Sequence, residues 1–452
     1  MSLIDLLLLF KLFNSIYISL PFKIQNFNYE KETSLIKNYI YKDIQTTFLV
    51  GTPAQKITIS ACLGEYTTFI LSHDAKGFNG SIYNKEISKT FTSYTEKPEF
   101  YFFQIFNKGI DSLDNFYIEK SKTKINNLEF MLATEVGVNN CHINYCEVLT
   151  QPGILGFLIK EKYDSLNITK LNFINQLKQK NLISDYYFNF HFDTEDSGNI
   201  VIGEKPHEYD NLHYNENNYL LTQTVILQKD IDWRMSFDKI YYGENEMENQ
   251  KSVILRIEYG LIMGDFPWQK YLESNFFNKY INETKCFKNK TTDTENYFTF
   301  YYCNKNIDLS EFKPFSFYIN YFNYNFTLTK DDLFIQDDNK YIFLMVFGKY
   351  DLIFGYPFLK KYQLIFNQNS KTIGFYNETK NSESPNNSFN IYYIAIIILS
   401  IILIFLIGIT IYLYILRNKN KKKNAEELTN EENEIITDIK NTNLINENNG
   451  IN

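Results

Sequence analysis

An uncharged run of 26 residues near the C-terminal end limits the topology of this chain more than any other feature. Residues 391–416 read IYYIAIIILSIILIFLIGITIYLYIL. As a helix rising about 1.5 Å per residue, this run is longer than the ~30 Å hydrocarbon core of a bilayer. The basic cluster RNKNKKK follows at 417–423. Because positive charge favours the cytoplasmic side, the sequence predicts a single-pass type I membrane protein whose larger part is lumenal or extracellular.

A second apolar stretch, at residues 3–20, has the length of a secretory signal peptide, and residues 1–20 are predicted to form one. Lys11 interrupts the stretch and no clean small-residue cleavage site follows, so an uncleaved N-terminal anchor is the alternative. The polar tail at 417–452 is predicted to be a disordered cytoplasmic segment. These segments place the protein at the cell surface or in an endomembrane such as the vacuolar membrane.

The charge of the chain excludes one class of partner. The net charge is −8, and the body carries no basic stripe, which argues against nucleic acid as a ligand. The sequence predicts no cofactor and no metal ion. A peptide or protein ligand remains open at this stage.

All five cysteines precede the apolar run at 391–416, on the part of the chain predicted to be lumenal or extracellular. Disulfides can persist in such an oxidising compartment. An odd number leaves at least one unpaired. Cys141 and Cys146 are close in sequence, as are Cys286 and Cys303, so these make the natural pairs and leave Cys62 over. Asn-x-Ser/Thr sequons permit N-glycosylation, although so Asn-rich a chain contains some by chance. They lie at Asn79, Asn167, Asn282, Asn289, Asn325, Asn377 and Asn386.

The body of the chain, from about residue 36 to 380, is dominated by strand patterns. Short runs rich in β-branched and aromatic residues are bounded by Gly, Asn, Asp and Ser. Helical periodicity stands out at 167–183 and again at 267–280. Strands and helices do not alternate, which argues against a doubly wound parallel sheet.

The two halves of the body also echo each other. Near the front of each, an alternating strand leads into a tight turn, and later in each an Ile-x-Gly triplet appears. The triplets are Ile154-Leu155-Gly156 and Ile353-Phe354-Gly355. This weak repeat predicts two similar lobes, at 36–190 and 191–380.

These segments, in order, resemble the pepsin-like aspartic peptidases. The run VGTPAQKITISACLGEYTTFILS at 50–72 is similar to the family's opening strand, its Gly-Thr-Pro-x-Gln turn and its first active-site loop. PGILGFL at 152–158 and DLIFGYPFLKKYQLIFNQNSKTIGFYN at 351–377 resemble later family segments. The resemblance implies a mostly β, bilobed pepsin-like fold, with two β-barrel-like lobes around a cleft. The apolar run at 391–416 adds one C-terminal transmembrane helix. The resemblance also places Cys286 and Cys303 where the family has its second-lobe disulfide.

The family's chemistry needs two aspartates that share a proton, one activating a water and one polarising the scissile carbonyl. By resemblance, the first aspartate position falls on Cys62, followed by Gly64 and Glu65. The second, in LRIEYGLIMG, falls on Arg256, followed by Glu258. The flap position that usually holds Tyr falls on Phe102, with Phe103 or Phe106 as alternatives.

With both acids replaced, the resemblance implies a pseudopeptidase that binds peptide or protein in its cleft. One alternative is an active endopeptidase that uses Glu65 and Glu258, or the thiol of Cys62, as unusual groups. Another is a structural surface glycoprotein. The Asp196-Ser197-Gly198 triplet looks catalytic but lies in a hairpin, where a surface turn is expected. Residues 21–37 leave little room for the pro-segment of a zymogen.

Arg256 raises a demand of its own, because a buried guanidinium is costly without a partner. We expect it to pair with Glu65 or Glu258. The alternative is that its long side chain reaches the water of the cleft.

Overall fold

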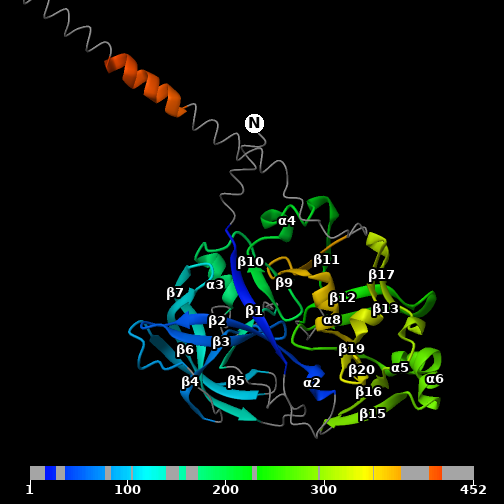
Figure 1. Cartoon of the computed structure of the whole chain (residues 1–452). Coiled ribbons are helices and arrows are strands. Elements are labelled where there is room, and N and C mark those ends of the chain that lie inside the picture. Colours follow the sequence, from blue (N-terminus) through cyan, green and yellow to red (C-terminus); the bar gives the residue numbers. More distant parts are fainter. Residues whose placement is uncertain are drawn as a thin grey trace, which may run out of the picture. The chain divides into compact units, whose positions relative to one another are not determined.

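Two large β-sheets build the body of the protein in the computed structural model, as Figure 1 shows. The structure describes residues 16–26, 36–76, 83–102, 105–138, 152–158, 172–225, 232–293, 296–349, 351–377 and 407–419. These residues divide into two units, 1–378 and 379–452. The predicted mostly β fold with two lobes is confirmed.

The first sheet has 13 strands and continues from the first lobe into a layer shared by both halves of the chain. Its order is β11 (Tyr219–Gln223), β24 (Thr372–Tyr376), β23 (Ile365–Asn367), β9 (Tyr187–Phe192), β10 (Ser197–Ile202), β1 (Ile18–Asn26), β2 (Lys42–Val50), β3 (Gln55–Cys62), β8 (Gly153–Gly156), β4 (Phe69–Lys76), β7 (Thr123–Val138), β6 (Ile105–Ile118) and β5 (Thr92–Phe102).

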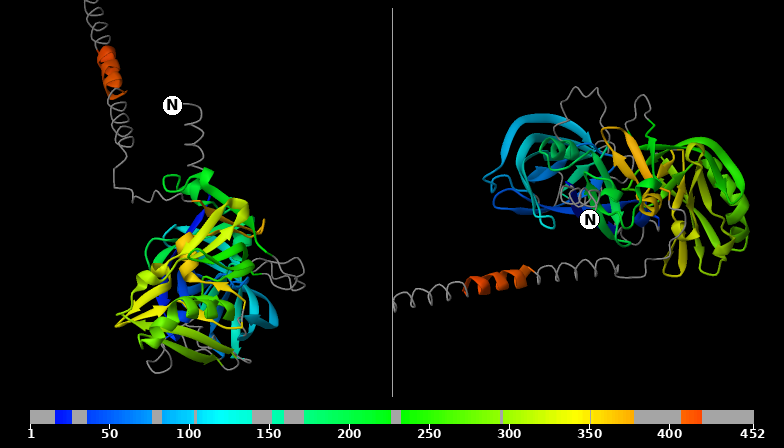
Figure 2. Two further views of the ribbon diagram at one scale, coloured as in Figure 1. Left: turned by 90° about the vertical axis from the view of Figure 1, so that its right-hand side faces the viewer. Right: turned by 90° about the horizontal axis from the view of Figure 1, so that it is seen from above.

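The second sheet belongs to the second lobe and has 11 strands. Its order is β18 (Tyr324–Leu328), β17 (Phe315–Ile319), β12 (Arg234–Tyr242), β13 (Asn245–Leu255), β22 (Ile353–Phe354), β14 (Ile262–Gly264), β21 (Met345–Phe347), β16 (Asn296–Asn304), β20 (Lys340–Phe343) and β19 (Phe334–Asp337), with β15 (Cys286–Asp293) paired to β16. The right-hand view of Figure 2 shows the cyan strands of the first lobe on one side and the yellow strands of the second lobe on the other.

Short helices cover the ends of the sheets. They are α2 (Lys37–Ile40), α3 (Phe173–Gln179), α4 (Pro206–Tyr209), α5 (Phe266–Leu272), α6 (Asn278–Asn282), α7 (Lys330–Leu333) and α8 (Tyr356–Tyr362), with short η segments at Glu216–Asn218, Glu273–Phe277, Leu309–Glu311 and Asn320–Phe322. The helix predicted at 267–280 is confirmed, and Pro267 lies in its first turn. The helix predicted at 167–183 is described only from 173 and ends at 179.

An aromatic cluster joins the lobes beneath the site. Trp233, at the entrance to β12, is fully buried, and its indole N–H donates to the carbonyl of Phe157 at 2.9 Å. Its ring contacts Phe188 from β9 and Phe366 from β23, at centroid distances of 6.0 and 4.9 Å. These strands come from distant parts of the chain, so the cluster fixes one lobe against the other.

Strand β1 is the main departure from the predicted boundaries. It lies between β2 and β10, with Phe22 opposite both Thr46 and Gly198. Ile18 and Leu20 are 2% and 0% exposed. The body therefore begins before residue 36, and residues 18–20 of the predicted signal peptide are part of its core.

The second unit is described at residues 407–419, which are helical. Among the described helices, none is both long and apolar enough to cross a bilayer. The rest of the predicted span, 391–406, lies outside the described residues, as do residues 1–15 and most of the tail. Cys141, Cys146, Asn79, Asn167 and Asn386 also lie outside them.

Candidate functional site

Two equivalent turns, one in each lobe, form the candidate site. In the first lobe β3 runs parallel to β8, which places Cys62 opposite Gly156, and β4 returns antiparallel to β8. In the second lobe β13 and β14 pair with β22 in the same way, and Arg256 follows directly after β13. The predicted repeat of the two halves therefore corresponds to one topology used twice.

The Ile-x-Gly triplets lie against these turns, as the sequence predicts. A Cβ atom on Gly156 would lie 2.6 Å from the carbonyl oxygen of Glu65, and one on Gly355 would lie 2.2 Å from that of Leu261. Neither position has room for a larger residue. The scaffold that positions the two turns is thus intact.

The N-terminal segment holds the second turn in place. The N–H of Lys42 donates to the carbonyl of Glu258 at 2.9 Å, and the N–H of Gly260 donates to the carbonyl of Ile40 at 2.8 Å. Tyr41 forms an isolated β-bridge with Tyr259. The N-terminal segment therefore fixes the backbone of the second turn at Glu258 and at Gly260.

Arg256 forms ion pairs with two carboxylates at this site. Its Nη2 atom lies 2.5 Å from Oδ1 of Asp232, and Nη1 lies 3.6 Å from Oε1 of Glu258. The side chain is 15% exposed. The expected pairing with Glu258 is confirmed, whereas the pairing with Asp232 was not foreseen. Burial lowers the pKa of Arg256, but Glu258 and Asp232 outweigh it, so the pKa is raised and the guanidinium stays charged.

Cys62 is a buried free thiol, 2% exposed. Its side chain hydrogen-bonds Glu258, whose Oε2 also accepts the N–H of Leu63 at 3.1 Å. Burial raises the pKa of Cys62 well above its usual value; Glu258 raises it further, and the opposing effect of Arg256 is too small to reverse this. A thiol needs a lowered pKa to act as a nucleophile, so this one lacks that activation.

Gly64 allows the guanidinium to lie directly on the first turn. A Cβ atom there would lie 1.7 Å from Nη1 of Arg256 and 2.7 Å from Oε1 of Glu258. The two turns are consequently in contact through the side chains of the second one.

Glu65 faces the backbone of its own turn. Its Oε1 atom accepts the N–H groups of Tyr66 and Thr67 at 2.9 and 3.0 Å. Burial nevertheless raises the pKa of Glu65 to about 7, against the opposing effect of these hydrogen bonds. The described contacts of Glu65 do not include an ion pair with Arg256, so of the two partners considered for Arg256 only Glu258 pairs with it.

The raised pKa of Glu65 predicts that stability depends on pH. The folded state holds this proton up to pH of about 7 and the unfolded state only to about 4.5. The stabilisation is therefore complete below the lower pKa and is lost as pH rises through the higher one. We expect the free energy of unfolding to fall by about 1–2 kcal/mol between pH 4.5 and 7.5, discounting the full shift for solvent.

Urea unfolding at several pH values checks this dependence. Glu65→Gln should weaken it without abolishing it, because burial also raises the pKa values of Glu258 and Glu204. Glu119→Gln, at an exposed position, should leave it unchanged. Equal slopes in the Glu65→Gln protein and the unchanged protein would show that Glu65 is not responsible.

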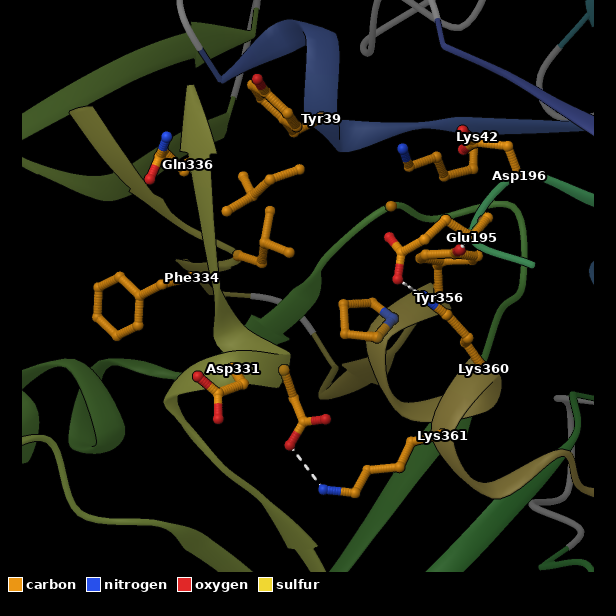
Figure 3. A pocket seen from close by; sticks show the side chains of 15 residues that line it. Tyr39, Lys42, Glu195, Asp196, Asp331, Phe334, Gln336, Tyr356, Lys360 and Lys361 are labelled. Carbon is orange, nitrogen blue, oxygen red and sulfur yellow. Dashed lines mark hydrogen bonds and ion pairs between the residues drawn. The ribbon is translucent and has the colours of Figure 1, made fainter. Parts of the chain in front are cut away.

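A pocket of about 530 Å³ lies beside the second turn and is shown in Figure 3. Gly260 of the turn lines it, together with Tyr39 and Tyr356. Its ionic groups are largely paired with one another: Lys360 with Glu195, and Lys361 with Asp332 at 2.6 Å. Neither Cys62 nor Arg256 lines this pocket, so it is adjacent to the paired turns and separate from them.

The remaining predicted residues fall at the surface or in the second lobe. Asp196 lies in the exposed turn between β9 and β10, which agrees with the predicted hairpin. The predicted disulfide between Cys286 and Cys303 is confirmed. Phe102 ends β5, and its side chain lies outside the described residues. Among the sequons, Asn282, Asn289 and Asn325 are exposed and Asn377 is half-buried.

Comparison with protein families bears directly on this geometry. The family model of eukaryotic aspartyl proteases matches residues 44–377. The chain belongs to this family. A search of curated proteins gave no match. Within this aspartyl protease fold, the two turns that carry Cys62 and Arg256 occupy equivalent places in the two lobes, each next to an Ile-x-Gly triplet.

Asp232 is the residue of the site that sequence reasoning missed. It precedes the buried Trp233 in the segment DWRMSFDKIYYGE, far from Arg256 in sequence. The sequence shows only an acidic residue next to Trp233 at the start of the second lobe. This pattern does not indicate that Asp232 pairs with Arg256.

Proposed function

We propose that this member of the aspartyl protease family is a membrane-anchored protein that does not hydrolyse peptides and that binds a peptide or protein segment between its lobes. One observation carries the proposal. At the second of the two equivalent turns Arg256 is bound by Asp232 and Glu258, and at the first turn Cys62 is a buried thiol.

These groups do not suit the family's reaction. Hydrolysis needs one carboxylate to activate a water and a second, protonated carboxyl to polarise the carbonyl. A guanidinium neither accepts a proton nor gives one up in a protein. Because Glu258 already binds Arg256, Cys62 and the N–H of Leu63, it is poorly placed to act as a free base.

Binding without cleavage remains compatible with the fold. The hairpin of β5 and β6 is the counterpart of the family's flap, and an extended peptide can pair with a strand edge through backbone hydrogen bonds. The intact Ile-x-Gly triplets support the turn of each lobe on which such binding would depend. A chain kept for a structural role alone would bind no peptide at this place.

Endopeptidase activity is the second candidate, and one observation favours it. Asp232 and Glu258 place two carboxylates on one guanidinium at the paired turns. If Arg256 shifted on substrate binding, these two carboxyl groups would be the pair to share a proton. Hydrolysis of denatured protein, blocked by a statine-type transition-state inhibitor, would favour this candidate.

The membrane anchor is proposed from the apolar run at 391–416 and the basic cluster at 417–423. We expect the full chain to stay with the membrane fraction after alkaline carbonate washing. Protease added outside sealed vesicles should remove the short tail and leave the lumenal body intact.

Peptide capture tests the binding role. The purified lumenal body is immobilised and exposed to a random peptide library, and we expect recovery of a set of extended peptides. A matched variant carries Gly64→Val, which places a side chain where the guanidinium lies and should disturb the floor of the site. A library that yields no peptide with the unchanged protein would favour a purely structural glycoprotein.

A further inference from the structure

The first described residues of the chain lie against a buried carboxyl group that the proposed function does not use. Glu204 follows β10 and is 6% exposed. Its Oε2 atom is buried and has no hydrogen-bond partner among the described residues. Burial raises the pKa of Glu204, and a cation or further donors beside this carboxyl group would stabilise its ionised form.

The nitrogen of Ile16 is already held against this carboxyl group. The backbone N–H of Ile16 hydrogen-bonds Glu204, and the hydroxyl of Ser184, which donates to the carbonyl of Gly203, lies beside the same carboxyl group. The carbonyl of Ile16 accepts the N–H of Ser184 at 2.8 Å. The next ring, that of Tyr17, stacks on Tyr209 with centroids 5.3 Å apart. Backbone hydrogen bonds therefore hold Ile16 in place, and a ring contact holds Tyr17.

The neighbouring side chains do not provide the missing cation. Lys205 pairs with Glu208 at 3.1 Å, and Lys178 donates to the carbonyl of Ser184. Glu208 adds a second negative charge near Glu204. Within the described part of the chain, Glu204 forms no ion pair. The titratable groups on the neighbouring segments are Lys178, Asp185, Lys205, His207 and Glu208.

Burial along β1 limits where the mature chain can begin. Ile16 and Tyr17 are 47% and 39% exposed, whereas Ile18 and Leu20 are 2% and 0% exposed. Cleavage after residue 17 or beyond would remove core residues or leave a charged terminus among them. Cleavage just before Ile16 spares the core and creates a cation at the nitrogen that touches Glu204.

We propose that the leader is removed by hydrolysis of the Ser15–Ile16 peptide bond and that the new α-ammonium group of Ile16 forms an ion pair with Glu204. Water adds across the bond: Ser15 keeps the carboxylate, and the released amine takes up a proton. An endopeptidase of the signal-peptidase class supplies the cleavage. The side chain of Ser15, directly before the cut, is small, whereas Phe13, two residues earlier, departs from the usual small-x-small pattern. The inference does not depend on whether the lobes hydrolyse peptides.

Mapping the mature N-terminus tests the proposal. The full chain is expressed in a eukaryotic secretory system, purified from membranes and analysed by N-terminal sequencing. We expect the first residue to be Ile16. A chain that still begins at Met1, or one that begins at Pro21, would overturn the proposal.

A second measurement tests the ion pair on the same processed protein. The α-amino group has an ordinary pKa of about 7.7–8.0, which a carboxylate partner raises. The stability that the ion pair contributes is therefore complete below the ordinary pKa of the amino group. It is lost as pH rises through the raised pKa. From pH 7 to pH 10, the melting temperature should fall by about 3 °C more in the unchanged protein than in Glu204→Gln.

The matched control is Glu208→Gln, because Glu208 is a nearby acid at an exposed position. This variant should keep the pH dependence of the unchanged protein. Equal pH profiles for the unchanged protein and Glu204→Gln would contradict the ion pair. If Glu204→Gln is not secreted, the N-terminal sequence of the unchanged protein still decides the cleavage site.

Discussion

Replacing Arg256 with methionine is expected to lower the free energy of unfolding by about 3–5 kcal/mol. The substitution keeps a long side chain but removes the cation that Asp232 and Glu258 share. Two carboxylates would then face each other at a largely buried site, and among the described residues only Asp232 would keep a cationic partner, Arg234 at 3.9 Å. Urea unfolding followed by the fluorescence of Trp233 and Trp268 gives the change directly.

A triple variant provides the control for this prediction. Adding Asp232→Asn and Glu258→Gln to Arg256→Met removes all three charges, and we expect most of the lost stability to return. The free energy of unfolding of Arg256→Lys should lie between those of the unchanged protein and Arg256→Met, because one ammonium group does not span both carboxylates as a guanidinium does. A stable Arg256→Met protein would contradict the importance of this ion-pair cluster.

Removing the disulfide should lower the free energy of unfolding nearly as much as Arg256→Met does. Cys286 and Cys303 lie opposite each other at the base of the hairpin of β15 and β16, with a sequence separation of 17. A loop of that length corresponds to about 3 kcal/mol of stabilisation through the unfolded chain. The double variant Cys286→Ala/Cys303→Ala should lose this amount in the same unfolding assay.

Cys62→Ala is the matched control for the disulfide, because Cys62 is equally buried but free. It should cost less than the double variant, and reducing agent should then still destabilise the protein. If reducing agent leaves the stability of the unchanged protein untouched, the bond between Cys286 and Cys303 does not form.

The fold could be predicted from sequence to a large extent, because strong local signals recur in the right order. The Gly-Thr-Pro-x-Gln turn and the two Ile-x-Gly triplets each mark a place where the backbone leaves little freedom. Gly156 and Gly355 are required by backbone atoms within 3 Å of a hypothetical Cβ. A position without room for a Cβ atom must hold glycine, so this steric demand is visible in the sequence itself.

The start of the body was misplaced because two patterns overlap there. In β1 the even-numbered residues Ile18, Leu20, Phe22 and Ile24 are buried, which is a period of 2. Most of the preceding residues are also apolar and hide the change from a leader to a strand. Only the partner strands β2 and β10 decide which residues belong to the core.

The site could be predicted only as far as local sequence reaches. Cys62, Arg256 and Glu258 stand in or next to the turns and could be found there. Asp232 lies just before β12, and its contact with Arg256 depends on how β12 and β13 pair. Long-range pairing of this kind has no signature in a single sequence.

The most direct test of the account is peptide hydrolysis by the purified lumenal body. Denatured protein is incubated with it from pH 2 to pH 7, with and without a statine-type inhibitor, beside Glu258→Gln and Asp232→Asn variants. The account predicts no inhibitor-sensitive cleavage by any of these proteins. Cleavage by the unchanged protein that the inhibitor blocks and that either variant abolishes would contradict it.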